Sequence, residues 1–288
     1  MTNSTAAAYA VLARFALGRQ AEAAGVRLRA LDGGLNNASW CVSSALGEWV
    51  IRLAGDCDQR FQINRVAERQ TQAAAAARGF APQILYAEPA HGVLVSEYLG
   101  AEVWTRQQTR TPDGIRMLGA RLGELHAAPA PKGVRRLDVH SVLAHYLELR
   151  GVTPGPVSRA DLSARLRWSL ATYRPAPPAL CHNDLHHRNL IGVSPLRFVD
   201  WEYGGVGDPI VELAAVIGYH DFDAGQRALL LEAHGGGYDP AQVARMCLVF
   251  DCLHALWLDA ADGWRTLDLE QQTALVERIS VDPALRER

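Results

Sequence analysis

The sequence predicts an α+β fold, with strands gathered in the N-terminal part and helices in the remainder. Short segments that alternate apolar and polar residues, joined by tight turns, are confined to the region before Gly100. After this residue the apolar positions recur mostly at helical spacing, and Pro/Gly clusters at 129–133, 153–157 and 175–178 punctuate the region. Strands that are segregated from helices indicate an α+β chain, because an α/β sheet would alternate the two.

The N-terminal part is expected to contain an antiparallel meander flanked by helices. Residues 6–24 are rich in Ala, Leu and Arg and predict one helix. A second helix is predicted over 64–78, where Gly79 ends an alanine-rich run. Turns at Asp32-Gly33-Gly34 and Leu46-Gly47-Glu48 separate the first three strands. The expected strands are 26–31, 38–42, 49–53, 84–86 and 93–98.

The helical part contains one exception, the stretch from Ala179 to Tyr203. Here two short apolar runs bracket a cluster of His, Asp and Asn residues, which predicts an embedded hairpin. The chain therefore divides into an N-terminal domain, residues 1–98, and a C-terminal domain, residues 99–288, with a hinge near Gly100. A chain of 288 residues is long enough for two adjoining lobes.

Composition excludes several classes of protein. Hydrophobic residues make up 49% and charged residues 21%, which argues against disorder, and the net charge of −2 suggests no nucleic-acid or anionic-membrane partner. Five scattered cysteines without a C-x-x-C pair favour free thiols in a reducing compartment. The N-terminus lacks the pattern of a signal peptide, and no uninterrupted apolar stretch is expected to span a bilayer. We therefore expect a soluble, cytoplasmic protein, and the sequence does not indicate its oligomeric state.

The strongest chemical signal lies between residues 181 and 200. It reads Cys181-His182-Asn183-Asp184-Leu185-His186-His187-Arg188-Asn189, followed by Phe198-Val199-Asp200, and has the form H-x-D-x-x-x-x-N with a second Asp sixteen positions on (200 − 184 = 16). Phosphoryl transfer needs such groups: one carboxylate orients the attacking hydroxyl, while an amide oxygen and another carboxylate hold Mg²⁺ against the phosphates. The pattern predicts a catalytic group of Asp184, Asn189 and Asp200.

Two other interpretations of this segment are possible. The histidines could be incidental, with Asp184 capping a helix, but the complete spacing between two apolar runs favours function. A zinc site could use His182, Asp184 and His186, although their i, i+2, i+4 spacing matches no usual ligand pattern.

The segment resembles the catalytic loop and metal-binding Asp of the protein-kinase fold. The run Asp200-Trp201-Glu202-Tyr203-Gly204-Gly205-Val206-Gly207-Asp208-Pro209, leading to Glu212-Leu213-Ala214, resembles the aminoglycoside phosphotransferase and choline kinase superfamily, and most of all its choline/thiamine kinase branch. The likeness extends, more weakly, over residues 30–260. It implies a bilobal protein-kinase-like fold, with a small antiparallel-sheet N-lobe and a larger, mostly helical C-lobe, that uses ATP and Mg²⁺.

The resemblance also implies roles for individual residues. Asp184 would be the catalytic base, Asn189 and Asp200 would bind Mg²⁺, and Glu202 would assist at the metal or the substrate. Many members of the superfamily carry Asp where Glu212 stands, so a structural role is expected for this residue.

The nucleotide is expected to lie on the N-terminal part. Gly33-Gly34-Leu35-Asn36-Asn37 lies between two strands, where a glycine loop covers the phosphates, and Gly33, Gly34 and Asn36 are the predicted contacts. The hinge, Ser96-Glu97-Tyr98-Leu99-Gly100, would present backbone groups of Glu97 and Leu99 to adenine.

A kinase also needs a cation on the third strand, paired with a helix glutamate. Lys132 is the single lysine and lies in a Pro-Lys-Gly loop, so the remaining 29 − 1 = 28 cationic residues are arginines and Arg52 must serve. Its predicted partner is Glu68. The alternative is a surface Arg–Glu pair of little energetic consequence.

The acceptor is predicted to be a small molecule with a hydroxyl group, either thiamine or choline/ethanolamine. A cationic alcohol calls for aromatic faces and carboxylates, and Trp257 is the predicted substrate residue beside Asp184 and Glu202. The helical spacing of Trp257 with Phe250 is also that of a core. Other candidates for such a pocket are Trp104, Trp201, Trp264, Asp251, Asp259 and Asp262.

Three alternatives to this function stay open. They are an aminoglycoside or sugar phosphotransferase, a non-catalytic nucleotide-binding homologue, and a zinc hydrolase. A protein kinase is disfavoured, because no A-P-E segment follows Asp200.

Overall fold

The computed structural model describes residues 3–31, 36–149, 155–261 and 263–280, and the chain divides into two compact units. The first unit comprises residues 1–104 and 188–204, and the second comprises residues 105–187 and 205–288. The segment 188–204, which the predicted division assigned to the C-terminal domain, therefore groups with the N-terminal strands.

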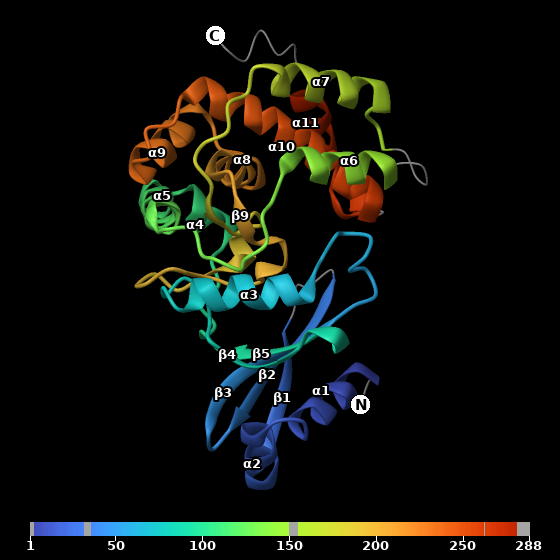
Figure 1. Cartoon of the computed structure of the whole chain (residues 1–288), viewed down its shortest axis with the longest axis vertical. Coiled ribbons are helices and arrows are strands. Elements are labelled where there is room, and N and C mark those ends of the chain that lie inside the picture. The colour runs from blue at the N-terminus through green and yellow to red at the C-terminus, as the bar shows by residue number, and fades with distance from the viewer. Residues whose placement is uncertain (1–2, 32–35, 150–154, 262, 281–288) are drawn as a thin grey trace. The chain divides into compact units, whose positions relative to one another are not determined.

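The first unit is built on a five-stranded antiparallel sheet with the order β1-β2-β3-β5-β4 (Figure 1). The first three strands form the predicted meander, and the α+β class is confirmed. The strands are β1 (Val26–Leu31), β2 (Asn37–Ser44), β3 (Gly47–Ala54), β4 (Ile84–Glu88) and β5 (Val93–Glu97).

Helices cover both faces of this sheet. Successive side chains of a strand point to opposite faces, so Trp49 and Ile51 pack against α1 (Asn3–Leu12) and α2 (Ala16–Ala24). Val50 and Arg52, which alternate with these two residues along β3, face the other side of the sheet, where α3 (Arg65–Ala76) lies (Figure 1). The sheet thus aims the buried Arg52 at α3, away from the apolar core under α1 and α2.

The single helix predicted over 6–24 is wrong, because α1 and α2 are separate helices. Phe15 has extended backbone angles (φ −131°, ψ 157°) and its ring stacks on that of Tyr86, with 5.0 Å between centroids. Leaving the helix lets Phe15 enter the core. Gly18 permits the tight junction, since a Cβ there would lie 2.3 Å from the carbonyl oxygen of Leu12.

The segment that leads to Asp200 is anchored in the first unit. The predicted hairpin around the His/Asp/Asn cluster is not present, because Ala179–Cys181, before the cluster, pairs with Gly205–Gly207. A shorter hairpin follows the cluster and consists of β7 (Leu190–Ile191) and β8 (Arg197–Phe198). The N–H of Phe198 donates to the carbonyl of Phe80 at 2.7 Å. Trp201, in the 3₁₀ turn η3 (Trp201–Tyr203), is fully buried and donates from Nε1 to the carbonyl of Phe198 at 2.8 Å. Trp104 is also buried and donates to the carbonyl of Gly192. Both indoles are therefore core groups and not part of an acceptor pocket.

A further 3₁₀ turn of the first unit, η1 (Pro89–His91), lies between β4 and β5.

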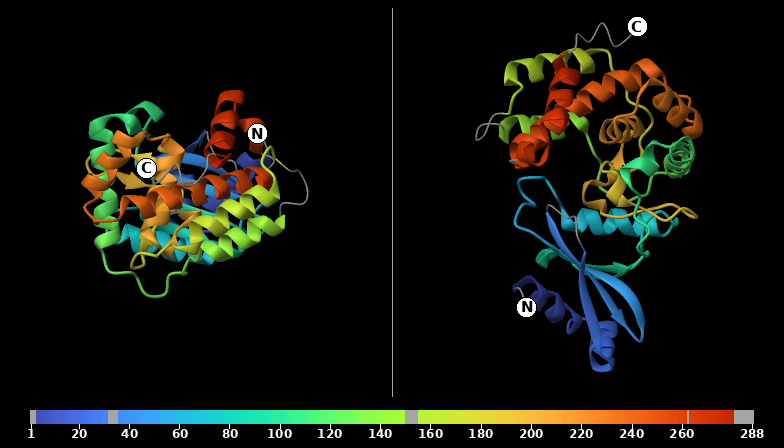
Figure 2. Two further views of the ribbon diagram at one scale, coloured as in Figure 1. Left: turned by 90° about the horizontal axis from the view of Figure 1, so that it is seen from above. Right: turned by 180° about the vertical axis from the view of Figure 1, so that it is seen from behind.

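The second unit is mostly helical, with one two-stranded sheet of β6 (Ala179–Cys181) and β9 (Gly205–Gly207). Helix α10 (Pro240–Ala261) is its central element (Figures 1 and 2). It packs against α6 (Val139–Leu149), α7 (Arg159–Ala171), α8 (Pro209–His220) and α11 (Leu269–Ser280). The other helices and 3₁₀ turns are α4 (Arg106–Arg110), α5 (Pro112–Ala127), η2 (His187–Asn189), α9 (Ala224–His234) and η4 (Gly263–Thr266).

Helix α10 is the one segment among the described residues that is long and apolar enough to cross a membrane, although charged residues interrupt its apolar run. By length and composition alone it qualifies, with a mean hydropathy of 1.3 over its best window. However, 61% of that window is buried inside the structure, and Asp251 and Asp259 lie on the buried part of the helix. These are the properties of a core helix, which is hydrophobic around most of its circumference because neighbours surround it.

Candidate active site

Three carboxylates meet in the first unit, contributed by Glu68 on α3, Asp200 after β8 and Glu202 in η3. One carboxylate oxygen of each lies within 4.8 Å of the others. Glu68 and Glu202 are buried, whereas the side chain of Asp200 is 30% exposed. Each ion would lose its hydration on burial, so a group of this kind requires cations among the carboxylates.

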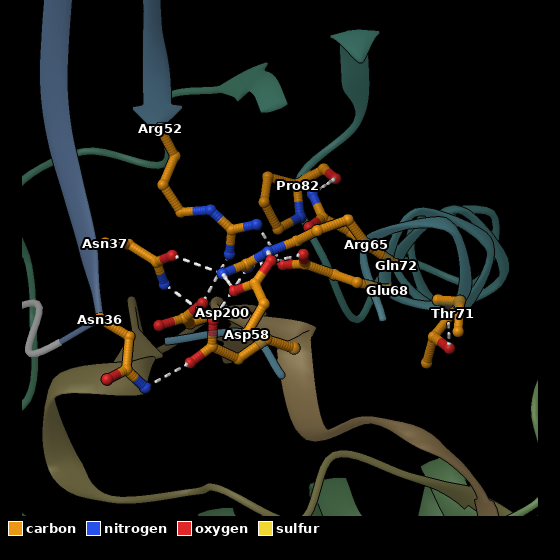
Figure 3. A network of polar contacts seen from close by, with 12 residues as sticks. Asn36, Asn37, Arg52, Asp58, Arg65, Glu68, Thr71, Gln72, Pro82 and Asp200 are labelled. Atoms are coloured by element: carbon orange, nitrogen blue, oxygen red, sulfur yellow. Dashed lines mark hydrogen bonds and ion pairs between the residues drawn. The ribbon is translucent and has the colours of Figure 1, made fainter. Parts of the chain in front are cut away.

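Arg52 is one of these cations (Figure 3). One of its terminal nitrogens contacts Glu68, and the other donates to Oδ1 of Asp200 at 2.7 Å. Burial opposes the charge of the guanidinium, but Glu68 and Asp200 outweigh it and raise the pKa of Arg52. The predicted Arg52–Glu68 pair is present with side chains 9% and 2% exposed, so the alternative of a surface pair is wrong.

Arg65 is the second cation, and it was not predicted. Its guanidinium contacts Asp58, Glu68, Glu202 and Asn37, at 2.5 to 3.0 Å (Figure 3). Burial opposes the charge of Arg65 too, but the bond to Asp58 and the two glutamates raise its pKa. The sequence signal was available in its position three residues before Glu68, the spacing at which helical side chains are neighbours.

Glu202 joins this cluster to the start of β2. Its Oε1 accepts from Nδ2 of Asn36 at 3.3 Å and its Oε2 from Nδ2 of Asn37 at 2.8 Å. Burial and the neighbouring charge of Asp200 raise the pKa of Glu202 to about 7. The structure therefore places Glu202 and Asn36 together with Asp200, as parts of one site.

This donor set fits a magnesium ion. Mg²⁺ prefers hard oxygen ligands from one or two carboxylates and keeps several waters, which suits a carboxylate such as Asp200 that is partly open to solvent. Asn189, the other predicted metal ligand, is buried, and its carbonyl accepts from the N–H of Val199 at 3.1 Å. The chain thus holds Asn189 against the residue that precedes Asp200.

Backbone strain marks both predicted catalytic segments. Asp200 has φ 64° and Asn183, beside Asp184, has φ 65°, a left-handed conformation that costs non-glycine residues about 1–3 kcal/mol. Such strain persists only where the surroundings hold it, and it is common at active sites.

In the second unit, Glu212 holds the turn before Asp184. Its fully buried carboxylate accepts from the backbone N–H groups of His182 at 2.6 Å and Asn183 at 2.8 Å, and it is 2.5 Å from Nε2 of His126. Burial alone would raise the pKa of Glu212, but the hydrogen bonds from His126 and from the N–H of Asn183 lower it. The structural role expected for Glu212 is what these contacts provide.

The bonds of Glu212 continue into a directed chain that assigns the tautomers of two histidines. The N–H of Gly236 donates to Nδ1 of His234. The other ring nitrogen of His234, Nε2, lies 2.8 Å from Nδ1 of His126 and donates to it. His126 then donates from Nε2 to Glu212. With neutral imidazoles every contact joins one donor to one acceptor, so this group is complete without the metal ion that His126, Cys181 and Glu212 could otherwise hold.

Asp184 lies in the loop between β6 and η2 of the second unit. Its Oδ1 accepts from the hydroxyl of Tyr219 at 2.7 Å, and its own N–H donates to Nδ1 of His182 at 3.3 Å. Nε2 of His186 is 3.8 Å from the other carboxylate oxygen. These three are not among the described groups whose ligand atoms come close enough for a metal, so the geometry does not support the zinc alternative.

The other predicted nucleotide residues are only partly described. Gly33 and Gly34 lie outside the described residues. Glu97 ends β5, is half-buried and pairs with Arg197 at 3.2 Å, and Leu99 follows it without helix or strand structure.

The predicted acceptor residues on the C-terminal helices have separate surroundings. Trp257 is half-buried on α10. Asp259 accepts from the indole of Trp264 at 2.6 Å and from the N–H of Gly155 at 2.8 Å, which is a structural arrangement. Asp251 pairs with Arg278 on α11 at 3.0 Å, and Asp262 lies outside the described residues.

The antiparallel sheet with its buried Arg–Glu pair, and the helical unit that carries the H-x-D loop, define a protein-kinase-like fold. The family model of the phosphotransferase enzyme family matches residues 27–245, and the chain belongs to this family.

Individual relatives agree with this membership. A choline/ethanolamine kinase family protein from Mesorhizobium loti has a similar structure, with a TM-score of 0.77 and 26% identity over 98% of this chain and 97% of the other. Choline kinase LicA from Streptococcus pneumoniae shares the fold, with a TM-score of 0.72 and 18% identity over 91% and 96% of the two chains. Thiamine kinase from Shigella dysenteriae is 36% identical over 127 residues, 43% of this chain and 42% of that protein. The chain thus matches less than half the length of this curated relative.

Proposed function

We propose that the protein is a small-molecule kinase that transfers the γ-phosphate of ATP to a hydroxyl of a small acceptor, with Mg²⁺ as cofactor. The observation that carries the proposal is the cluster of Arg52, Glu68, Asp200 and Glu202 in the first unit. The sequence motif that ends at Asp200 also supplies Asp184 and Asn189. Family membership supports the same class of reaction.

Each residue has a distinct task in this proposal. Asp200 and Asn189 would hold Mg²⁺, which neutralises charge on the phosphates when bound. Arg52, fixed by Glu68, presents a permanently charged guanidinium for the α- and β-phosphates. Asp184 orients the acceptor hydroxyl and takes its proton, while the bond from Tyr219 holds one oxygen of the carboxylate in place.

Nucleotide binding falls to the first unit. The backbone of Glu97 and Leu99 would contact adenine, and the loop of Gly33 and Gly34 would cover the phosphates up to Asn36. In support, a choline kinase LicA with a similar fold, with a TM-score of 0.70 and 17% identity, forms a complex with AMP. Free cysteines, four of the five buried, suit the reducing cytoplasm.

For the acceptor we propose thiamine or choline/ethanolamine. Two relatives, which are named for choline/ethanolamine and for thiamine, support these alcohols as acceptors. Around Asp184, the ring of Tyr219 meets those of Phe250 at 5.0 Å and His254 at 5.9 Å, and Trp257 lies on the same helix as these last two. Aromatic faces of this kind suit a cationic alcohol. An aminoglycoside or sugar phosphotransferase is the alternative.

The test is coupled ADP release with Mg²⁺ and ATP against thiamine, choline, ethanolamine, an aminoglycoside and several sugars. We expect turnover with one acceptor and its loss in Asp184→Asn, which keeps the shape of the side chain and removes the base. Nucleotide binding, measured separately by calorimetry, should survive in this variant. ATP binding without turnover on any acceptor would favour a non-catalytic nucleotide-binding protein, and failure to bind ATP would refute the proposal.

A further inference from the structure

Arg65 begins α3, a position that helix electrostatics does not favour for a cation. The N-cap is Asn64, whose side chain accepts from the N–H of Ala67 at 2.9 Å, so Arg65 stands in the first turn. Partial positive charge gathers at this end of a helix, and arginine is better placed near the other end. Arg65 is nevertheless buried, with 8% of its surface exposed. A residue that contradicts its local context points to a task set by the tertiary structure.

Every N–H of the Arg65 guanidinium has a partner. Nε and one terminal nitrogen donate to the two oxygens of Asp58, at 2.8 and 2.5 Å, in a bidentate pair. The second bond of that nitrogen goes to Oδ1 of Asn37 at 3.0 Å. The other terminal nitrogen donates to Glu68 and Glu202, both at 3.0 Å. An arginine has five N–H donors, so none is left for a phosphate.

The charges of the cluster give Arg65 a second task. When all four are ionised, Asp58, Glu68, Asp200 and Glu202 supply four negative charges, and Arg52 and Arg65 supply two positive charges. The balance, −4 + 2 = −2, is opposite to the charge of one Mg²⁺. Without Arg65 the balance would be −3, and the carboxylates that it bridges would repel each other.

Arg65 also links the carboxylates to the start of β2. Asn37 accepts from Arg65 and donates to Oε2 of Glu202, and Asn36 donates to Oε1 of the same carboxylate (Figure 3). Both oxygens of Glu202 are therefore engaged by the last two residues of the predicted glycine loop. Displacement of Arg65 would release Glu202, Glu68 and Asn37 together.

We propose, on the basis of the proposed kinase function, that Arg65 is a positioning residue. It holds the carboxylates of the magnesium site in register and fastens them to the end of the nucleotide loop. Arg52 binds the phosphates, and Arg65 holds the carboxylates of the cluster in their positions. Arg65 touches neither nucleotide nor acceptor, and its effect reaches the reaction through Glu68, Glu202 and Asn37.

The test measures binding of a non-hydrolysable ATP analogue to the full chain by calorimetry, over a series of Mg²⁺ concentrations. The variants are Arg65→Met and Arg65→Lys. The matched control is Arg14→Met, which breaks an ion pair with Glu88 in the same unit, where the arginine side chain is 40% exposed.

We expect Arg65→Met to need about 10- to 100-fold more Mg²⁺ for half-maximal nucleotide binding, the loss that removal of a group supporting metal ligands usually causes. Arg65→Lys keeps the charge but has three donors and no fork, so it should recover part of this loss. The control should match the wild type. Asn37→Ala keeps both arginines and removes the link to β2, and it carries the same test if Arg65→Met does not fold.

The outcomes separate this inference from the proposed function. If the wild type binds the nucleotide with Mg²⁺, but folded Arg65→Met or Asn37→Ala shows the same Mg²⁺ dependence, the positioning role is overturned and the kinase proposal stands. If the wild type shows no Mg²⁺-dependent nucleotide binding, both are overturned. If Arg65→Met loses the same nucleotide affinity with and without Mg²⁺, the positioning role is also overturned, because a merely structural role would have this effect.

Discussion

Replacement of Glu212 by glutamine tests whether the buried hydrogen-bond chain holds the catalytic loop. In the native protein, Oε1 accepts from the N–H groups of His182 and Asn183, and Oε2 accepts from His126. Glutamine has the same shape but one oxygen and one NH₂ group. With the oxygen kept on the backbone N–H groups, the NH₂ group faces the N–H of His126, and two donors meet.

A change of tautomers does not remove this conflict. If His126 turned Nε2 into an acceptor, its Nδ1–H would face the Nε2–H of His234. If His234 then changed its tautomer too, its own Nδ1–H would face the N–H of Gly236. The alternative amide orientation would oppose two backbone N–H groups at once.

The expected cost follows from the three bonds to the carboxylate. A bond to a charged group contributes about 1.5–3 kcal/mol and a neutral one about 0.5–1.5 kcal/mol, so each bond loses about 1 kcal/mol when the charge is removed. We therefore expect Glu212→Gln to lower the free energy of unfolding by about 2–4 kcal/mol, a large share of a typical total of about 5–15 kcal/mol.

The assay is urea unfolding followed by tryptophan fluorescence, with the midpoint compared among variants. Glu232→Gln is the control, because it makes the same change at an exposed position of α9 and should change stability by less than about 0.5 kcal/mol. Equal urea midpoints for Glu212→Gln and Glu232→Gln would show that the hydrogen-bond chain through Glu212 does not hold the catalytic loop.

Three further predictions follow from the same structure. Burial lowers the pKa of His220 to about 3 and that of His234 to about 4, from 6.5, so the unfolded chain binds protons that the native protein excludes. The stability that these two histidines contribute is nearly complete at pH 7.5 and is lost as the pH falls through 6.5 toward their folded pKa values, by about 4 kcal/mol for the pair at pH 5; equal urea midpoints at pH 7.5 and pH 5 would contradict this. Asp200→Ala should abolish Mg²⁺-dependent nucleotide binding and turnover together, and an active variant would remove Asp200 from the metal site. Arg52→Lys keeps the charge but not the two-sided contact with Glu68 and Asp200, so its affinity for Mg²⁺ and nucleotide should fall about 10-fold or more, and an unchanged affinity would show that one point charge suffices.

Much of the fold could be predicted because its signals are local. Alternation of apolar and polar residues located β1, β2 and β3, since a strand with one face on a core must repeat every second residue. The break between α1 and α2 could not be found in this way. No proline marks it, and the backbone leaves the helix at Phe15 because the ring of Tyr86 lies across the core, far away in sequence.

The candidate site shows the same division. Arg52 could be predicted from the third strand and a nearly complete lack of lysine, and Glu68 from the helix that follows. The helical spacing of Arg65 to Glu68 could have indicated that one pair, but not the full role of Arg65, because its other partners come from three further segments of the chain. Trp201 was a candidate for the acceptor pocket until its burial and its bond to Phe198 placed it in the core.

The sequence by itself determined the strands of the N-terminal sheet and the helical character of the region after them, the spacing of Asp184, Asn189 and Asp200, and the use of arginine in place of lysine. These properties depend on neighbours along the chain, so they are written in periodicity and motif. Only the tertiary structure decided which charged residues share the buried cluster with Asp200, and which histidines support the turn at Glu212. The physical reason is that a buried charge must be paired wherever the fold places it, and the partners come from segments that only folding brings together.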